Sequence, residues 1–221
     1  MSEKKTYIEE LNRNREILSG NPSQKERLEA MMEICYGCVL VAEENQRLYM
    51  EYENAGLMEE FLRYAQEIEG YDHLLQELYS ACGRMEKTVT CHPRLLARFK
   101  RFYRQVVNRV EIAFCDGHEL GISEDLSQEI SDFERNIHFA NNGEWDKIAS
   151  FGHLKADPIE WSEEFEKVID EVERELYEYF KEEERMMGFC FGFWSQKKSL
   201  LAERGIEWRT PAEMNPRVLF D

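Results

Sequence analysis

The sequence predicts an all-α fold: a compact multi-helix bundle of six to eight helices with a docked C-terminal tail. Glycine and proline are scarce, at 12 and 5 of 221 residues, and glutamate dominates the charged residues, a balance that favours helix over sheet. Apolar residues also recur at helical spacing along most of the chain. Because 43% of the residues are hydrophobic, the chain can bury a core and we do not expect it to be disordered.

Caps, glycines and prolines predict where each helix begins and ends. Thr6 with Glu9, and Ser23 with Glu26, match the capping-box pattern, and Pro93 suits the first turn of a helix. The expected helices span about residues 6–19, 23–54, 57–69, 74–85, 93–115, 123–141, 145–151 and 157–203, the last with a bend near Gly188.

We interpret residues 1–221 as a single helical domain. The polar, glycine-containing segment 116–121 is the best candidate for a boundary between two halves, residues 1–116 and 122–204, and residues 205–221 form a tail. In that tail, Thr210-Pro211 followed by Glu213 indicates a one-turn helix.

The tail is too apolar to remain in solvent, so we expect it to pack on the bundle. Burial is predicted above all for Trp208 and Phe220. The other apolar residues of the tail are Met214, Val218 and Leu219.

The chain begins with charged residues and no apolar stretch, so we expect no secretory signal and a cytoplasmic location. The longest apolar run, Gly188–Trp194, is far shorter than the roughly 20 residues that cross a bilayer, so no membrane partner is expected. In that compartment the six cysteines should stay reduced.

Cys35 and Cys38 form the most motif-like pair. A structural zinc site needs four ligands, and no second Cys-x-x-Cys pair follows; Cys82, Cys91 and His92 supply further ligands only if the fold brings them close. A thioredoxin-like role needs a preceding strand, whereas this pair lies in a helical pattern. We therefore expect buried core thiols and neither a bound metal nor another cofactor, with zinc and redox roles as alternatives.

No motif identifies an enzyme, and no catalytic residue is assigned. The alternative function is a metal-dependent, phosphohydrolase-like enzyme that uses carboxylates on helices, with His73 or His138 nearby. An acidic chain produces many such carboxylate pairs by chance. The candidates are Glu26/Glu29, Glu129/Asp132, Glu160/Glu163 and Glu163/Glu166.

Charge is the most informative feature of the sequence. The chain has 45 acidic and 28 basic residues, a net charge of −17. The stretch from Glu119 to Arg185 holds 21 acidic and 7 basic residues, a net of −14. Five glutamates fall on one flank of the expected long helix and are the candidate partner-binding residues, which we call the acidic flank: Glu164, Glu171, Glu175, Glu178 and Glu182.

The basic residues gather elsewhere, with seven bases and no acid between Lys87 and Val110. Four arginines of the fifth expected helix form a ridge beside its apolar face and are a minor alternative site for an anion: Arg94, Arg98, Arg101 and Arg109. Direct nucleic-acid binding there is disfavoured, because the rest of the chain carries a net charge of −24.

Three interpretations of this charge pattern remain open. The acidic flank is a solvated face, partly paired with the arginines; or it binds a basic protein partner; or the arginines bind an anion. We favour a non-enzymatic interaction protein, an adaptor or an inhibitor, that binds a basic protein partner. Nucleic-acid-processing proteins are among the candidate partners, because an acidic ridge imitates the spacing of nucleic-acid phosphates.

Overall fold

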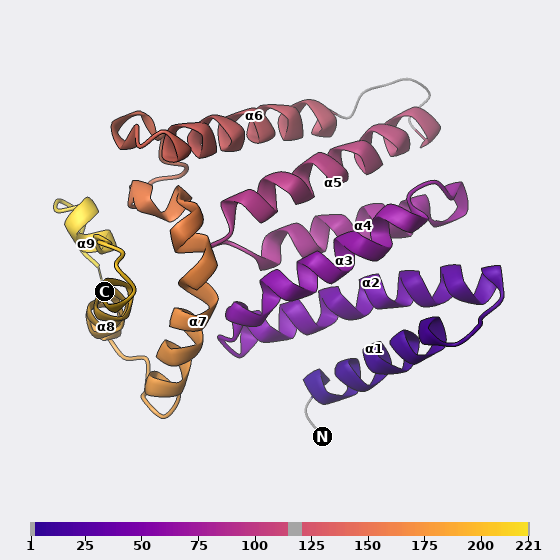
Figure 1. The fold of residues 1–221 in the computed structure, drawn as a ribbon, viewed down its shortest axis with the longest axis horizontal. Helices are drawn as coiled ribbons and strands as arrows, with labels where there is room; N and C mark the ends of the chain where they lie inside the picture. Colours follow the sequence, from indigo (N-terminus) through magenta and orange to yellow (C-terminus); the bar gives the residue numbers. More distant parts are fainter. Residues whose placement is uncertain (1–2, 115–120, 221) are drawn as a thin grey trace. The chain divides into compact units, whose positions relative to one another are not determined.

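A computed structural model describes residues 3–114 and 121–220, in which every regular element is a helix and no strand occurs. The all-α prediction is confirmed: eight α-helices precede the tail, and a ninth lies within it (Figure 1). The α-helices are α1 (Glu3–Ser19), α2 (Gln24–Arg47), α3 (Asn54–Ile68), α4 (Leu75–Met85), α5 (Pro93–Phe114), α6 (Ile122–Asn141), α7 (Glu163–Phe180), α8 (Phe189–Glu203) and α9 (Pro211–Met214).

The chain divides into two compact units. Unit 1 comprises residues 1–90 and 95–131, and unit 2 comprises residues 91–94 and 132–221. The change from one unit to the other therefore falls inside α6, and the short segment Cys91–Arg94 belongs to unit 2. The boundary expected at 116–121 lies almost entirely outside the described residues and stays a prediction.

Unit 1 is built around α2, which α1, α3 and α4 each contact (Figure 1). The capping box of Ser23 and Glu26 starts α2, as expected. A Cβ at Gly37 would lie 2.9 Å from a methyl carbon of Leu11, so glycine at this position permits the close approach of α1 to α2. The expected apolar face of α5 is buried; it consists of Leu95, Leu96, Phe99, Phe102, Tyr103, Val106 and Val110.

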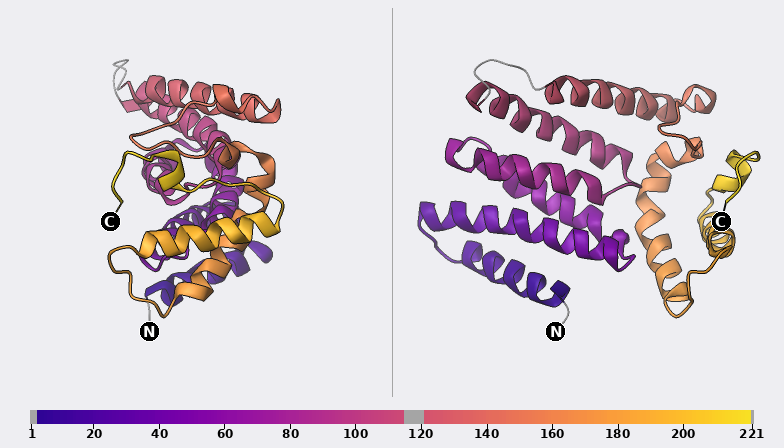
Figure 2. Two further views of the ribbon diagram at one scale, coloured as in Figure 1. Left: turned by 90° about the vertical axis from the view of Figure 1, so that its left-hand side faces the viewer. Right: turned by 180° about the vertical axis from the view of Figure 1, so that it is seen from behind.

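Unit 2 is built around α7 and α8, which pack against each other (Figure 2). Ser162 caps α7 by accepting a hydrogen bond from the backbone N–H of Phe165. One stripe of α7 is buried, and it consists of Phe165, Ile169, Val172, Leu176 and Phe180. Leu200, Leu201 and Trp208 complete the same hydrophobic cluster.

The prediction of one helix from residue 157 to residue 203, bent near Gly188, is wrong. A 3-10 turn, Pro158–Trp161, precedes α7, and α7 ends at Phe180. The next five residues are Lys, three Glu and Arg, so no apolar side chain continues the buried stripe. Gly188 then starts α8 with a φ of +85°, a left-handed conformation that glycine adopts without strain.

Three other boundaries also differ from the expected ones. The first helix begins at Glu3, so Thr6 lies inside α1 and does not cap its start. The second helix ends at Arg47, seven residues early, where Tyr49 takes a positive φ of 60° and Asn54 begins α3. Around Trp145 the structure has only the 3-10 turn Trp145–Lys147, because Ile148 returns to an extended backbone.

The tail packs on unit 2 as expected, although not along its whole length. Trp208 is 4% exposed, and its ring N–H donates to Glu160 Oε1 over 2.7 Å. Thr210 and Glu213 form the expected capping box. Phe220 is half-buried, with its ring centroid 5.1 Å from that of Trp194. Two apolar residues near the end of the tail do not pack on unit 2: Val218 is 43% exposed and Leu219 is 95% exposed.

Candidate functional site

The helix α7 carries acidic residues on both sides of its buried stripe. At 100° per residue, Glu166, Asp170 and Glu173 lie on one side of the stripe. The acidic flank lies on the other side for its four members within α7, Glu164, Glu171, Glu175 and Glu178, which recur at steps of seven, four and three residues. Glu182, expected on the same helix, lies beyond its last residue, Phe180, because α7 is shorter than the expected helix. The two sets of carboxylates can therefore serve different purposes on one helix.

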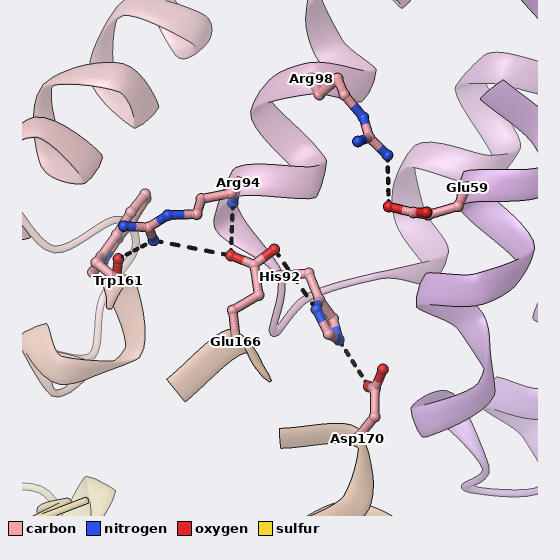
Figure 3. A network of polar contacts seen from close by, with 7 residues as sticks. All are labelled: Glu59, His92, Arg94, Arg98, Trp161, Glu166 and Asp170. Atoms are coloured by element: carbon pink, nitrogen blue, oxygen red, sulfur yellow. Dashed lines mark hydrogen bonds and ion pairs between the residues drawn. The ribbon is translucent and has the colours of Figure 1, made fainter. Parts of the chain in front are cut away.

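The first set binds the segment Cys91–Arg94, which we call the clasp (Figure 3). His92 is 7% exposed, and its Nε2 lies 2.7 Å from Asp170 Oδ1. Its Nδ1 lies 3.7 Å from Glu166 Oε1. The backbone N–H of Arg94 donates to Glu166 Oε2 over 3.1 Å, and the Arg94 guanidinium donates to the backbone carbonyl of Trp161. The clasp is thus held on α7 by charge as well as by hydrogen bonds.

Two carboxylates decide the protonation state of His92. Burial lowers the pKa of its imidazole, but hydrogen bonds to Asp170 and Glu166 outweigh burial and raise it to about 9. At neutral pH, His92 is therefore an imidazolium. Because Glu166 and Asp170 contact opposite ring nitrogens, the three side chains do not converge on one point where a metal ion would sit.

A second buried pair continues this side of α7. Lys197 of α8 is buried, and its Nζ lies 2.9 Å from Glu173 Oε1. Burial lowers the pKa of Lys197, but the charge of Glu173 more than compensates, so the ammonium stays charged. The same Nζ lies 5.6 Å from the ring centroid of Trp208, and Cys91 Sγ lies 3.6 Å from the same carboxylate oxygen of Glu173.

The acidic flank is only partly neutralised within unit 2. Arg204, the residue after the end of α8, contacts Glu171 at 3.4 Å and Glu175 more closely, and Lys181 contacts Glu178 at 2.7 Å. Glu164 and Glu182 are exposed, and within the described part of the chain neither forms an ion pair within 4.0 Å. Lys167, which is bound to Glu163, also lies near enough to Glu164 for their charges to interact. The five carboxylates thus have three cations near them, which leaves an excess of negative charge on this face.

The arginine ridge differs, because its members are taken up by carboxylates outside the flank. Arg98 contacts Glu59 at 2.7 Å (Figure 3), and Arg109 contacts Glu69 at 3.0 Å. Arg109 also contacts Asp72, and Arg94 contacts Glu166 at 4.0 Å. Arg101 is engaged as well. Pairing between the ridge and the flank was one of the open interpretations; for Arg94, which lies in unit 2 with the flank, the contact is with Glu166, outside the flank.

The carboxylates considered for metal binding are each occupied by partners within the protein. Glu26 closes its capping box, Glu129 contacts Lys100, Asp132 contacts Arg135, Glu160 accepts from Trp208, and Glu163 contacts Lys167. His73 and His138 stand beside aromatic rings. In residues 3–114 and 121–220, no group of three or more His, Cys, Asp or Glu side chains is arranged to hold a metal ion.

Replacing both Cys35 and Cys38 by alanine is expected to cost about 1 kcal/mol of unfolding free energy for each thiol, without loss of metal. Both thiols are buried, Cys38 with its Sγ 3.8 Å from Glu60 Oε2, and burial raises the pKa of each, so neither is a reactive thiolate at neutral pH. Urea denaturation and metal analysis of the two proteins check this. One zinc per chain that is lost in the double variant would contradict it.

The chain matches no protein-family model, no curated protein and no solved structure. Among the described helices, none is both long enough and apolar enough to span a bilayer.

Proposed function

We propose that this chain is a non-enzymatic interaction protein, an adaptor or an inhibitor acting in the cytoplasm, whose acidic flank binds a basic protein partner. The supporting observation is that the carboxylates on the two sides of α7 differ in how far cations within unit 2 neutralise them. Glu166, Asp170 and Glu173 are occupied by the clasp and by Lys197, whereas Glu164 and Glu182 of the flank are exposed and form no ion pair within 4.0 Å among the residues that the structure describes.

The dimensions of the flank suit a long-range electrostatic contact. Glu164 and Glu178 are fourteen residues apart on one helix, about 21 Å at 1.5 Å per residue. A row of carboxylates of this length attracts a cationic protein before contact and raises its association rate. The same field repels nucleic-acid phosphates, so the candidate partner is a basic protein, nucleic-acid-processing proteins included.

Charge reversal on the flank is expected to abolish capture of such partners. The reversed residues are Glu164, Glu178 and Glu182, each changed to lysine, because Glu171 and Glu175 also bind Arg204 and their loss would disturb unit 2. The matched control reverses the same number of exposed glutamates on α1 and α2, Glu10, Glu16 and Glu33. Exposed charges contribute little to stability, so all three proteins should melt alike.

The measurement is affinity capture from a lysate of the source cell with the wild type, the flank variant and the control variant as bait. Basic proteins retained by the wild type and the control but lost from the flank variant would support the proposal, and their association should weaken steeply as salt rises. Equal capture by all three baits would overturn it.

A further inference from the structure

The turn between α7 and α8 exposes an unusual amount of apolar surface. Met186 and Met187 are 70% and 88% exposed. They stand between two exposed aromatic residues, Tyr179 at the end of α7 and Phe191 in the first turn of α8. We call these four side chains the methionine patch.

The patch rests on a fixed base rather than on a loose loop. The ring of Tyr179 lies 4.7 Å from that of buried Phe180, which lies 5.3 Å from the ring of Phe189. The backbone N–H of Phe189 donates to the carbonyl of Met186, which closes the turn just before α8. The ring of Phe191 lies 5.6 Å from that of Trp194. Tyr179 and Phe191 are therefore ordered by neighbouring rings, and the backbone of Met186 is fixed by the start of α8.

Leaving such side chains in water has a cost that binding would recover. Burying a methionine or phenylalanine side chain is favourable by about 1.5–3 kcal/mol, and contiguous exposed apolar surface marks interaction sites. Methionine is flexible and polarisable, so it adapts to the shape of a partner's apolar face.

Charge decides which occupant fits. The turn from Lys181 to Arg185 carries three exposed carboxylates, Glu182, Glu183 and Glu184, and two cations, so its net charge is −1. Lys181 contacts Glu178 at 2.7 Å, and the Arg185 guanidinium lies 5.3 Å from the ring centroid of Phe189, so that in the described part of the chain the three carboxylates form no ion pair within 4.0 Å. An anionic lipid surface would be repelled by these carboxylates, and so would a second copy of a chain with a net charge of −17. A partner with apolar and cationic groups on adjacent faces satisfies both features.

We infer that the methionine patch and the adjoining acidic turn dock one basic amphipathic helix of a protein partner, with its apolar stripe on the patch and its lysines or arginines against Glu182–Glu184. This inference rests on the proposed function and adds what the flank alone lacks, a contact that discriminates between cationic partners by shape. Apolar side chains at helical spacing would anchor the helix, and the carboxylates would set its direction.

The test compares two peptides of about 14 residues with one composition of leucine and lysine. In the first peptide the leucines form a single helical stripe; in the second they are scattered around the helix. The full chain is expected to bind the striped peptide at least about tenfold more tightly, which corresponds to the burial of one methionine side chain. Fluorescence anisotropy of labelled peptides measures both affinities.

Replacing Met186 and Met187 together by glutamine is expected to remove that preference and to leave binding of the scattered peptide unchanged. The matched control replaces two exposed isoleucines outside the patch, Ile17 and Ile112, by glutamine and should keep the preference. All of these side chains are exposed, so each variant should fold.

The outcomes separate this inference from the proposed function. The inference would be overturned if the chain bound both peptides with equal affinity, or if the methionine variant kept the preference for the striped peptide. The proposed function would still be supported if the variant with Glu164, Glu178 and Glu182 changed to lysine lost binding of the scattered peptide. Concentration-dependent dimerisation, or binding to phosphatidylcholine vesicles, that disappears in the methionine variant would overturn it in favour of a second copy or a lipid surface.

Discussion

Replacing Lys197 by methionine is expected to lower the free energy of unfolding by about 3 kcal/mol, because it leaves the carboxylate of Glu173 without its cation inside unit 2. Lys197 is buried and Glu173 keeps some contact with solvent, which places the cost at the lower end of the range for broken buried pairs. Urea denaturation at neutral pH measures the change, provided that its slope stays constant.

The matched control replaces both partners, Lys197 by methionine and Glu173 by leucine. This double variant should recover most of the lost stability, because two apolar side chains of similar volume need no compensating charge. A double variant that is as unstable as the single one would show that methionine fails for reasons of packing against Trp208 and Phe165, and not because a charge is unpaired.

The second large effect concerns pH. His92 has an ordinary pKa of 6.5 in the unfolded chain and a pKa of about 9 in the folded protein, where it contacts Asp170 and Glu166. The folded state therefore holds the proton more tightly, and the resulting stabilisation is complete below pH 6.5 and lost as the pH rises through about 9. A shift of this size corresponds to about 3 kcal/mol.

Urea denaturation at a series of pH values between 6 and 10 should show this decline in the wild type. His92→Gln, which keeps a hydrogen-bond donor but no titrating charge, is expected to be less stable at pH 6 and to show a much flatter profile. The groups that face the ring within unit 2 are Glu166 and Asp170, with Arg94 beside Glu166. A variant with the same decline as the wild type would assign the pH dependence to other groups.

Features that depend on neighbouring residues could be predicted from the sequence. The capping boxes at Ser23 and Thr210 bond the free backbone N–H groups at the start of a helix, and all the residues involved lie within four positions of one another. A short sequence pattern is therefore enough to predict them. The buried faces of α5 and α7 follow from helical spacing in the same way. Burial of Cys35 and Cys38 follows from their place on the apolar side of α2.

Features that depend on distant residues could not be predicted. In the clasp, His92 contacts Asp170, which lies 78 positions later in the sequence. Neither residue belongs to a sequence motif from which the other could be predicted. Arg174 stands one helical turn from Asp170 in the sequence, so spacing alone favours a pair within the helix. The only signal was indirect: acids are absent between Lys87 and Val110, so cationic groups there had to find carboxylates elsewhere in the fold.

The acidic flank lies between these cases. The alignment of its first four members on one side of α7 follows from spacing alone, whereas the end of α7 before Glu182 was not expected. The partial neutralisation of the flank by Arg204 depends on the turn that brings α8 back along α7. That turn was expected as a bend in one helix, because the apolar residues from Phe189 to Trp194 resemble a continuation of the buried stripe. The three glutamates before them interrupt it.

Mapping where a cation binds on the full chain tests the role of the acidic flank most directly. Amide ¹H–¹⁵N spectra recorded during titration with an oligolysine peptide at low salt are expected to shift chiefly between Glu164 and Glu182, and to return to their starting positions as salt rises. Shifts spread evenly over the acidic surfaces of both units, or absent from α7, would contradict a partner-binding role for this flank.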